Sequence, residues 1–195
     1  MDKALFIETL NKGTTKLELR KLLINSCLKN PSYLTILLEN AQQVDDKNST
    51  FSTRILELTC KKKIAIIIPH LNEFCEMLKL LKQAASIRAC AKICELLMLE
   101  YFSNKNLYFK NMISNLHEEK IIASGFDWMI DNQPTAIQAY TMRTLYLLGT
   151  KTKHDWVHPE LALIIEKNIP SGSIGLVNRG RKVIKAIQTE TALKL

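Results

Sequence analysis

Two histidines four residues apart flank an aspartate and a tryptophan in the stretch KHDWVHPEL. On one helix, His154 and His158 would share a face and Asp155 could orient an imidazole, which is how zinc sites are built. Pro159, however, disfavours helical backbone at the residue before it and marks the next helix as starting there. We therefore interpret the stretch as the start of a helix, with His158 beside that start and Trp156 as an apolar anchor that fills the space between helices. The pattern predicts no metal site, and no other cofactor is indicated.

A second Asp-Trp pair, Asp127 and Trp128, lies in the stretch GFDWMID. Its apolar residues suit a buried helix, and its acids suit the solvent side of that helix. The motifs of common enzyme classes are missing, since the chain contains no G-x-G-x-x-G, G-x-x-x-x-G-K-[ST], G-x-S-x-G or H-E-x-x-H. The sequence therefore indicates no catalytic residues. A catalytic site would require Asp127, Asp155 or the two histidines to meet in one pocket.

Apolar residues recur with the spacing of a helix along the whole chain, and almost no stretch alternates with the period of a strand. Four of the periodic runs open at a proline, namely Pro31, Pro69, Pro134 and Pro159, where the missing N–H costs nothing. The stretch 102–115 is the least regular and predicts a short extra helix or a long connection. We expect helices near residues 2–11, 15–28, 31–43, 50–62, 68–82, 85–102, 117–131, 134–148, 159–168 and 173–188.

The bulk composition is typical of one ordered domain in a reducing compartment. The chain has 195 residues, of which 47% are apolar and 24% are charged, so it is long enough to bury a sizeable core. No apolar run approaches the roughly 20 residues that span a bilayer, and we expect no membrane association. The five cysteines include no C-x-x-C pair, which indicates reduced thiols and a cytoplasmic location. The net charge of +8 is concentrated in residues 1–63 and 150–195, so basic ends flank a neutral middle.

An internal repeat organises the chain. The stretch IPHLNEFCEMLKLLKQAASIRACAKICELL resembles VHPELALIIEKNIPSGSIGLVNRGRKVIKAI, with Pro-x-Leu opening each first helix and Ser-Ile opening each second helix. Taking Glu57, Glu95, Leu145 and Lys182 as equivalent gives steps of 38, 50 and 37 residues, and the long step contains the irregular stretch. Helix pairs that repeat at about 37 to 40 residues resemble HEAT and armadillo-type repeats.

This resemblance, which covers most of the chain from Pro31 onward, implies an all-α fold, a right-handed superhelix of stacked helical hairpins. We expect a single helical-repeat domain over residues 1–195. Its expected parts are N-terminal capping helices over about 1–30, repeats over about 31–188 and a short tail over 189–195. Such an architecture implies a binding function, in which a concave surface of second helices holds a protein segment without catalysis.

Five cations lie near equivalent positions of successive second helices, and we expect them to bind the partner. They are Arg54, Arg88, Lys92, Arg143 and Arg179. A ladder of cations would favour an acidic peptide or a phosphate backbone.

The last helix carries a polar stripe of Asn178, Arg181, Lys182 and Lys185 opposite an apolar stripe. A phosphate-bearing ligand could use Arg181, Lys182 and Lys185. We favour the alternative that the stripe is the polar outer face that a terminal repeat needs for solubility, because no stacking aromatic residues are interleaved with it.

The alternative function is nucleic-acid binding. Tryptophan beside aspartate, at Trp128 and Asp127, in a basic helical-repeat chain resembles the DNA-alkylation-repair glycosylases, in which aromatic residues and an acid meet the damaged nucleotide. The resemblance implies that these two residues would face a nucleotide. Steep dependence on salt would distinguish phosphate binding from the binding of a protein segment.

Overall fold

The protein is built from helices. The computed structural model describes residues 1–13, 16–103, 107–131, 133–168 and 172–194, without the side chains of residues 47 and 191–194. These residues form helices, turns and no strand, which confirms the all-α prediction. None of the described helices is long and apolar enough to cross a membrane. The α-helices are α1 (Lys3–Asn11), α2 (Leu17–Lys29), α3 (Tyr33–Gln42), α4 (Lys47–Lys62), α5 (Leu71–Leu78), α6 (Ala84–Tyr101), α7 (Leu107–Met112), α8 (Asn115–Ile130), α9 (Thr135–Gly149), α10 (Val157–Asn168) and α11 (Ile174–Lys194), and the 3₁₀ helices are η1 (Ile64–His70) and η2 (Thr152–His154).

Side-chain caps fix several of the helix starts. Asp2 and Asp46 each accept a backbone N–H from the first turn of the helix that follows them. At the start of α8, the Ser114 hydroxyl accepts the backbone N–H of His117, and Nδ1 of His117 accepts the backbone N–H of Ser114. Each cap satisfies an N–H that has no partner within its own helix.

Several helix boundaries differ from the predicted ones, and the irregular stretch takes one of its two predicted forms, a short extra helix. Pro69 lies inside η1, so the α-helix expected from residue 68 begins at Leu71 instead. Part of the irregular stretch 102–115 forms α7. The last helix continues to Lys194, so residues 189–194 of the expected tail are helical, because the sequence after Gly180 contains neither glycine nor proline to end the helix. Leu195 lies outside the described residues.

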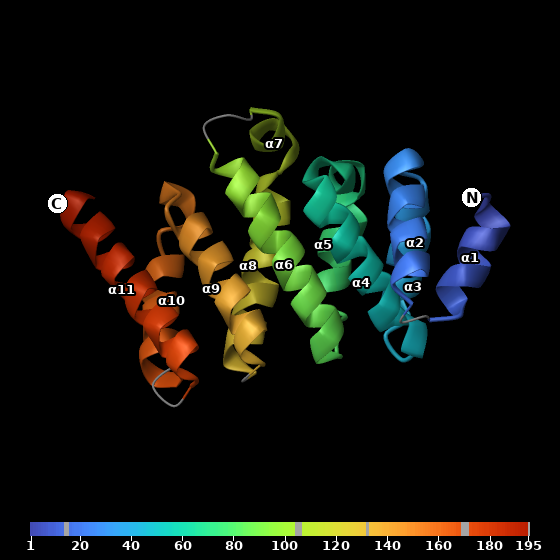
Figure 1. Ribbon diagram of the computed structural model, residues 1–195. Helices are drawn as coiled ribbons and strands as arrows, with labels where there is room; N and C mark the ends of the chain where they lie inside the picture. Colours follow the sequence, from blue (N-terminus) through green and yellow to red (C-terminus); the bar gives the residue numbers. More distant parts are fainter. Residues whose placement is uncertain (14–15, 104–106, 132, 169–171, 195) are drawn as a thin grey trace.

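The helices stand side by side in two rows (Figure 1). We define the second-helix row as α4, α6, α9 and α11, in which each helix contacts the next. The first-helix row consists of α3, α5, α8 and α10, and here too each helix contacts the next. Contacts of α3 with α4, of α8 with α9 and of α10 with α11 hold the two rows together. The chain thus advances along the stack, and its two ends lie at opposite sides of Figure 1.

The hydrophobic core lies where the helices of the two rows meet. Phe74 of α5, Leu97 of α6, Leu145 of α9 and Leu161 of α10 are all completely buried. Burying one such side chain contributes roughly 1.5–3 kcal/mol. The helix α6 is buried on several sides, because it contacts α4, α7, α8 and α9. This agrees with its sequence, in which Cys90, Cys94 and Leu97 lie on one apolar face and Ile93 and Leu96 on a second.

Candidate functional site

The two histidines of KHDWVHPEL do not meet. His154 ends η2, and its Nε2 lies 2.8 Å from Oε2 of Glu118. His158 lies in the first turn of α10, where its Nε2 is 2.9 Å from the backbone oxygen of Tyr146. Asp155 is exposed between them. The described part of the chain contains no group of three or more His, Cys, Asp or Glu residues that could hold a metal ion.

The two tryptophans differ in their exposure to solvent. Trp156 is 48% exposed and stacks on Phe126 with ring centroids 5.6 Å apart. The prediction that it fills the space between helices is therefore wrong, because the turn before α10 leaves the ring on the surface of α8. Trp128 is only 5% exposed, so little of its ring is open to a nucleotide. Asp127, Trp128 and Lys79 line one hollow of about 340 Å³, and neither Asp155 nor the histidines line it.

A buried glutamate lies at the α4–α6 interface. Glu57 of α4 is completely buried, and three cations surround it. Arg54 and Lys61 come from its own helix, whereas Arg88 reaches it from α6 at 2.9 Å. Burial raises the pKa of Glu57, but the hydrogen bonds from Lys61 and Arg54 and the charges of Arg54 and Arg88 outweigh it, so the pKa is lowered. Glu57 is therefore a carboxylate that binds two neighbouring helices together.

The same arrangement recurs at the α6–α9 interface. Glu95 of α6 is buried, Lys92 of the same helix lies 2.6 Å from it, and Arg143 of α9 approaches it at 3.9 Å. The ammonium group of Lys92 also lies over the ring of Tyr140, 4.7 Å from its centroid. Arg143 remains 53% exposed. Both interfaces thus share one pattern, in which a cation precedes the glutamate by three residues and an arginine reaches it from the next helix of the row.

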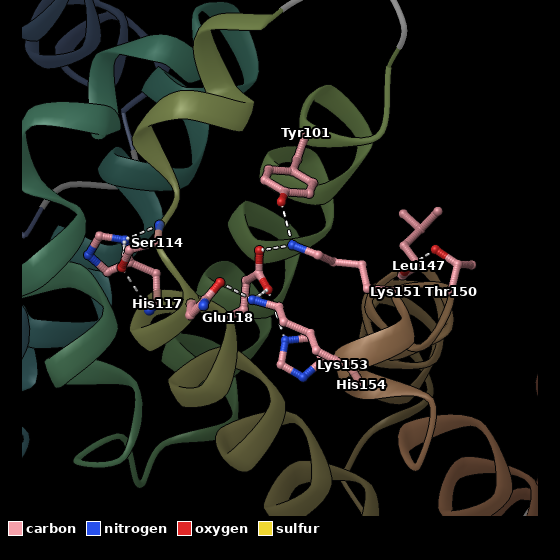
Figure 2. Close-up of polar contacts among 10 residues, drawn as sticks. Tyr101, Ser114, His117, Glu118, Leu147, Thr150, Lys151, Lys153 and His154 are labelled. Carbon is pink, nitrogen blue, oxygen red and sulfur yellow. Dashed lines mark hydrogen bonds and ion pairs between the residues drawn. The ribbon is translucent and has the colours of Figure 1, made fainter.

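A third buried glutamate, Glu118, belongs to the first-helix row (Figure 2). Lys151, Lys153 and His154 approach its carboxylate from the segment that follows α9, at 2.5, 2.7 and 2.8 Å. Lys151 also donates to the hydroxyl of Tyr101 on α6. Burial raises the pKa of Glu118, but its hydrogen bonds with these three residues outweigh it and lower the pKa. The cluster ties α8 to the end of α9 and explains why His154 is buried.

The predicted cation ladder lies along the second-helix row, and buried glutamates take up part of its charge. Arg54 and Arg88 pair with Glu57, and Lys92 pairs with Glu95. Sequence reasoning did not identify these glutamates as part of the site. The signal that could have found them is the repeated spacing of Arg54-x-x-Glu57 and Lys92-x-x-Glu95.

The α9–α11 interface departs from this pattern. On α9 the cation is Arg143, and the residue three positions later is Tyr146 rather than a glutamate. A groove of about 460 Å³ opens at this point, and the described residues that line it include three cationic side chains and no carboxylate. The lining residues are Arg143, Tyr146, Gly175, Asn178, Arg179, Lys182, Val183 and Ala186.

The groove divides the predicted stripe on the last helix. Asn178 and Lys182 line the groove together with Arg179, which donates to the backbone oxygen of Ala139 at 3.2 Å. The other two predicted phosphate-binding residues, Arg181 and Lys185, are exposed but do not line it. The reason is geometric, because the packing of α11 on α9 and α10 determines which part of the polar face borders the groove. The opposite apolar stripe is packed against the core as predicted.

Tyr146 is held firmly in the lining of the groove. Its hydroxyl donates to Glu190 near the end of α11, and its ring stacks on His158 with centroids 5.4 Å apart. Burial and the adjacent carboxylate raise the pKa of Tyr146 to about 12. The tyrosine therefore stays protonated and neutral, and one ring face and its hydroxyl are already in use.

No protein-family model matches the chain, and neither a curated protein nor a solved structure matches it. The functional inference therefore rests on the charge and geometry of the three helix interfaces.

Proposed function

We propose that this chain is a HEAT or armadillo-type helical-repeat protein, a right-handed superhelix of stacked hairpins, that binds an acidic protein segment without catalysing a reaction. The two rows of helices and the repeat steps of 38, 50 and 37 residues support the architecture. The five described cysteines are all free and buried, which is consistent with a reducing cytoplasmic compartment. The second-helix row is the proposed binding surface.

The observation that carries the proposal is a surplus of cations along this row. Three cations surround the single carboxylate of Glu57, and two approach the single carboxylate of Glu95. At the α9–α11 interface, Arg179 and Lys182 line a groove in which none of the described lining residues is a carboxylate. Each of the three interfaces therefore presents net positive charge, and a segment rich in Asp and Glu is the complementary partner.

The buried glutamates also prepare the cations for binding. A long arginine or lysine side chain loses rotamer freedom when it is fixed by a ligand, and this loss weakens binding. Arg54 and Arg88 are already held on Glu57, yet about one third of each side chain remains exposed. A guanidinium has five N–H donors, so each arginine retains donors for a second carboxylate.

A protein segment suits this surface better than a nucleic acid does. Proteins that bind single strands usually stack bases on aromatic rings. Along the second-helix row, one face of Tyr140 is covered by the ammonium of Lys92, and one face of Tyr146 is covered by His158. Trp128 is buried in the core. Among the described residues of the row, these two tyrosines therefore each have one ring face already in use.

Fluorescence anisotropy with two short labelled peptides tests the proposal, one rich in glutamate and the other rich in lysine. We expect only the glutamate-rich peptide to bind, and its binding to weaken between about 50 and 200 mM salt less steeply than the binding of a phosphate backbone would. Replacing Arg88 by Gln should weaken it several-fold, because Glu57 keeps two cations while the surface loses one. The matched control is Lys167→Gln, which removes an exposed cation from α10 in the other row.

Two results would overturn the proposal. One is that Arg88→Gln and Lys167→Gln weaken the binding of the glutamate-rich peptide equally, which would mean that only the net charge of the chain matters. The other is binding of a single-stranded oligonucleotide that is tighter than binding of the glutamate-rich peptide and equally sensitive to Arg88→Gln. That result would favour the nucleic-acid function.

A further inference from the structure

We propose that the groove between α9 and α11 is a binding site for a phosphate monoester, carried by a phosphorylated serine or threonine within the acidic segment. The inference rests on the proposed function, because it assigns one position of that segment to one place on the second-helix row. The described residues that line the groove bring three cations and no carboxylate.

The repeated ion-pair pattern shows what is missing at this interface. Glu57 is the internal anion of the α4–α6 interface, and Glu95 is that of the α6–α9 interface. At the α9–α11 interface the repeat register aligns Leu145 with these two glutamates, and the residue three positions after Arg143 is Tyr146, so neither position brings a negative charge. The cations of this interface therefore converge without the anion that accompanies them at the other two.

The cations of the groove are also the least neutralised of the row. Arg143 has its described ion pair with Glu95 at 3.9 Å, which is too long for a hydrogen bond. Arg179 uses one N–H on the backbone oxygen of Ala139 and so is oriented without being neutralised. Lys182 forms no ion pair with any described residue. The carboxylate of Glu190 accepts the Tyr146 hydroxyl and does not line the groove.

The number of donors favours a phosphate over a carboxylate. A phosphate monoester carries a charge of about −1.5 to −2 at pH 7 and three acceptor oxygens, whereas a carboxylate carries one charge and two oxygens. The groove combines two guanidinium groups, one ammonium and the amide of Asn178. Arginine clusters are a recurrent means of recognising phosphorylated segments. A volume of about 460 Å³ accommodates a phosphorylated side chain with part of its backbone.

The surroundings of the groove do not favour a nucleotide. The only aromatic residue in the described lining is Tyr146, and its ring is stacked on His158 while its hydroxyl is bound to Glu190. A base inserted here would have to displace one of these contacts. A phosphate on a flexible peptide requires neither change.

The test uses three acidic peptides that differ only at a central residue, which is serine, glutamate or phosphoserine. Isothermal titration calorimetry with the whole chain should give an affinity for the phosphoserine peptide about tenfold above that for the other two. The double variant Arg179→Ala and Lys182→Ala should remove this advantage and leave the affinity for the glutamate peptide close to that for the phosphoserine peptide. The matched control, Arg181→Ala with Lys185→Ala, removes two cations from the same helix outside the groove and should retain the advantage.

The outcomes separate this inference from the proposed function. Equal binding of all three peptides to the wild type would overturn the phosphate site and leave the acidic-segment function standing, whereas no binding of any peptide would overturn both. The phosphate site would also be overturned if the variant with Arg179→Ala and Lys182→Ala still bound the phosphoserine peptide more tightly than the other two peptides. The groove would be assigned to nucleic acid if an oligonucleotide competed for it more strongly than the phosphoserine peptide does. The variant with Arg179→Ala and Lys182→Ala would then have to lose this competition. A second readout does not depend on any variant folding. When the phosphoserine peptide binds to the wild type, we expect the amide chemical shifts of Arg143, Arg179 and Lys182 to change.

Discussion

Arg88 of α6 and Glu57 of α4 form an ion pair of 2.9 Å across a helix interface, and the glutamate side chain is completely buried. The pair contributes to the fold because it bridges neighbouring helices, and it contributes to the surface because part of the arginine remains exposed. One contact therefore supports both the stacking of helices and the positive charge of the second-helix row.

Removing the buried carboxylate should destabilise the protein. The change Glu57→Gln leaves three cations close together without their shared anion. We expect the free energy of unfolding to fall by about 3 kcal/mol, the lower end of the range for breaking a buried pair, since the cations stay partly hydrated. Urea denaturation measures the change. Glu8→Gln, which removes an exposed ion pair with Lys12, should cost less than about 1 kcal/mol, and equal losses in the two variants would contradict the structural role of Glu57.

Gly149 should tolerate no side chain. A Cβ atom at this position would lie 2.2 Å from Cδ2 of His158 and 2.7 Å from its Nε2. We expect Gly149→Ala to lower the free energy of unfolding by about 1–3 kcal/mol, because the imidazole must leave its hydrogen bond with the backbone of Tyr146. At Gly175 nothing lies within 4 Å of an added Cβ. Gly175→Ala should therefore leave the thermal midpoint unchanged or raise it, and a similar drop for both variants would show that the close approach of His158 is unimportant.

The stability contribution of Glu118 should depend on pH in the acid range. Its pKa in the folded protein lies below the ordinary value of 4.5, so the carboxylate stabilises the fold fully above that value. The contribution is lost as the pH falls through the lowered pKa. The difference in thermal midpoint between the wild type and Glu118→Gln should therefore be largest near neutral pH and shrink below about pH 4.5. A difference that stays constant down to pH 3 would show that the charge of Glu118 is not what stabilises the cluster in Figure 2.

The cysteines should be inert in the folded protein. Burial raises the pKa of Cys27 and of Cys75 to about 12, and it also raises the pKa values of the other three thiols. Because the thiolate is the reactive form, we expect negligible reaction with a thiol-specific chromogenic reagent at pH 8. All five thiols should react after denaturation in guanidinium. Rapid modification of one thiol under native conditions would show that a helix around it opens readily.

The local features of the fold could be predicted from the sequence. Helical periodicity reflects which side of each helix is buried, so the helices and the two apolar faces of α6 emerged from spacing alone. Proline was a less exact guide. Pro69 and Pro159 both lie near a helix start, but a 3₁₀ helix precedes α5, and α10 begins two residues before Pro159. The type of helical repeat remains a prediction.

The candidate site was harder to predict because it depends on pairs distant in sequence. Arg88 and Glu57 are 31 residues apart, and periodicity within one helix carries no information about such a pair. The same limit applies to the last helix. Its sequence indicated a polar face, but the position of α9 determines that Arg179 rather than Arg181 lines the groove. The buried position of His154 likewise depends on Glu118, which lies on another helix.

The contrast between Trp128 and Trp156 gives the molecule two intrinsic optical reporters. The indole of Trp128 is surrounded by the core and should emit at short wavelength, whereas that of Trp156 borders solvent beside Phe126 and should emit at longer wavelength. A soluble quencher would therefore reach Trp156 first. The native emission spectrum combines a core signal from α8 with a surface signal from the turn before α10, so loosening of that turn can be followed separately from global unfolding without attaching a dye.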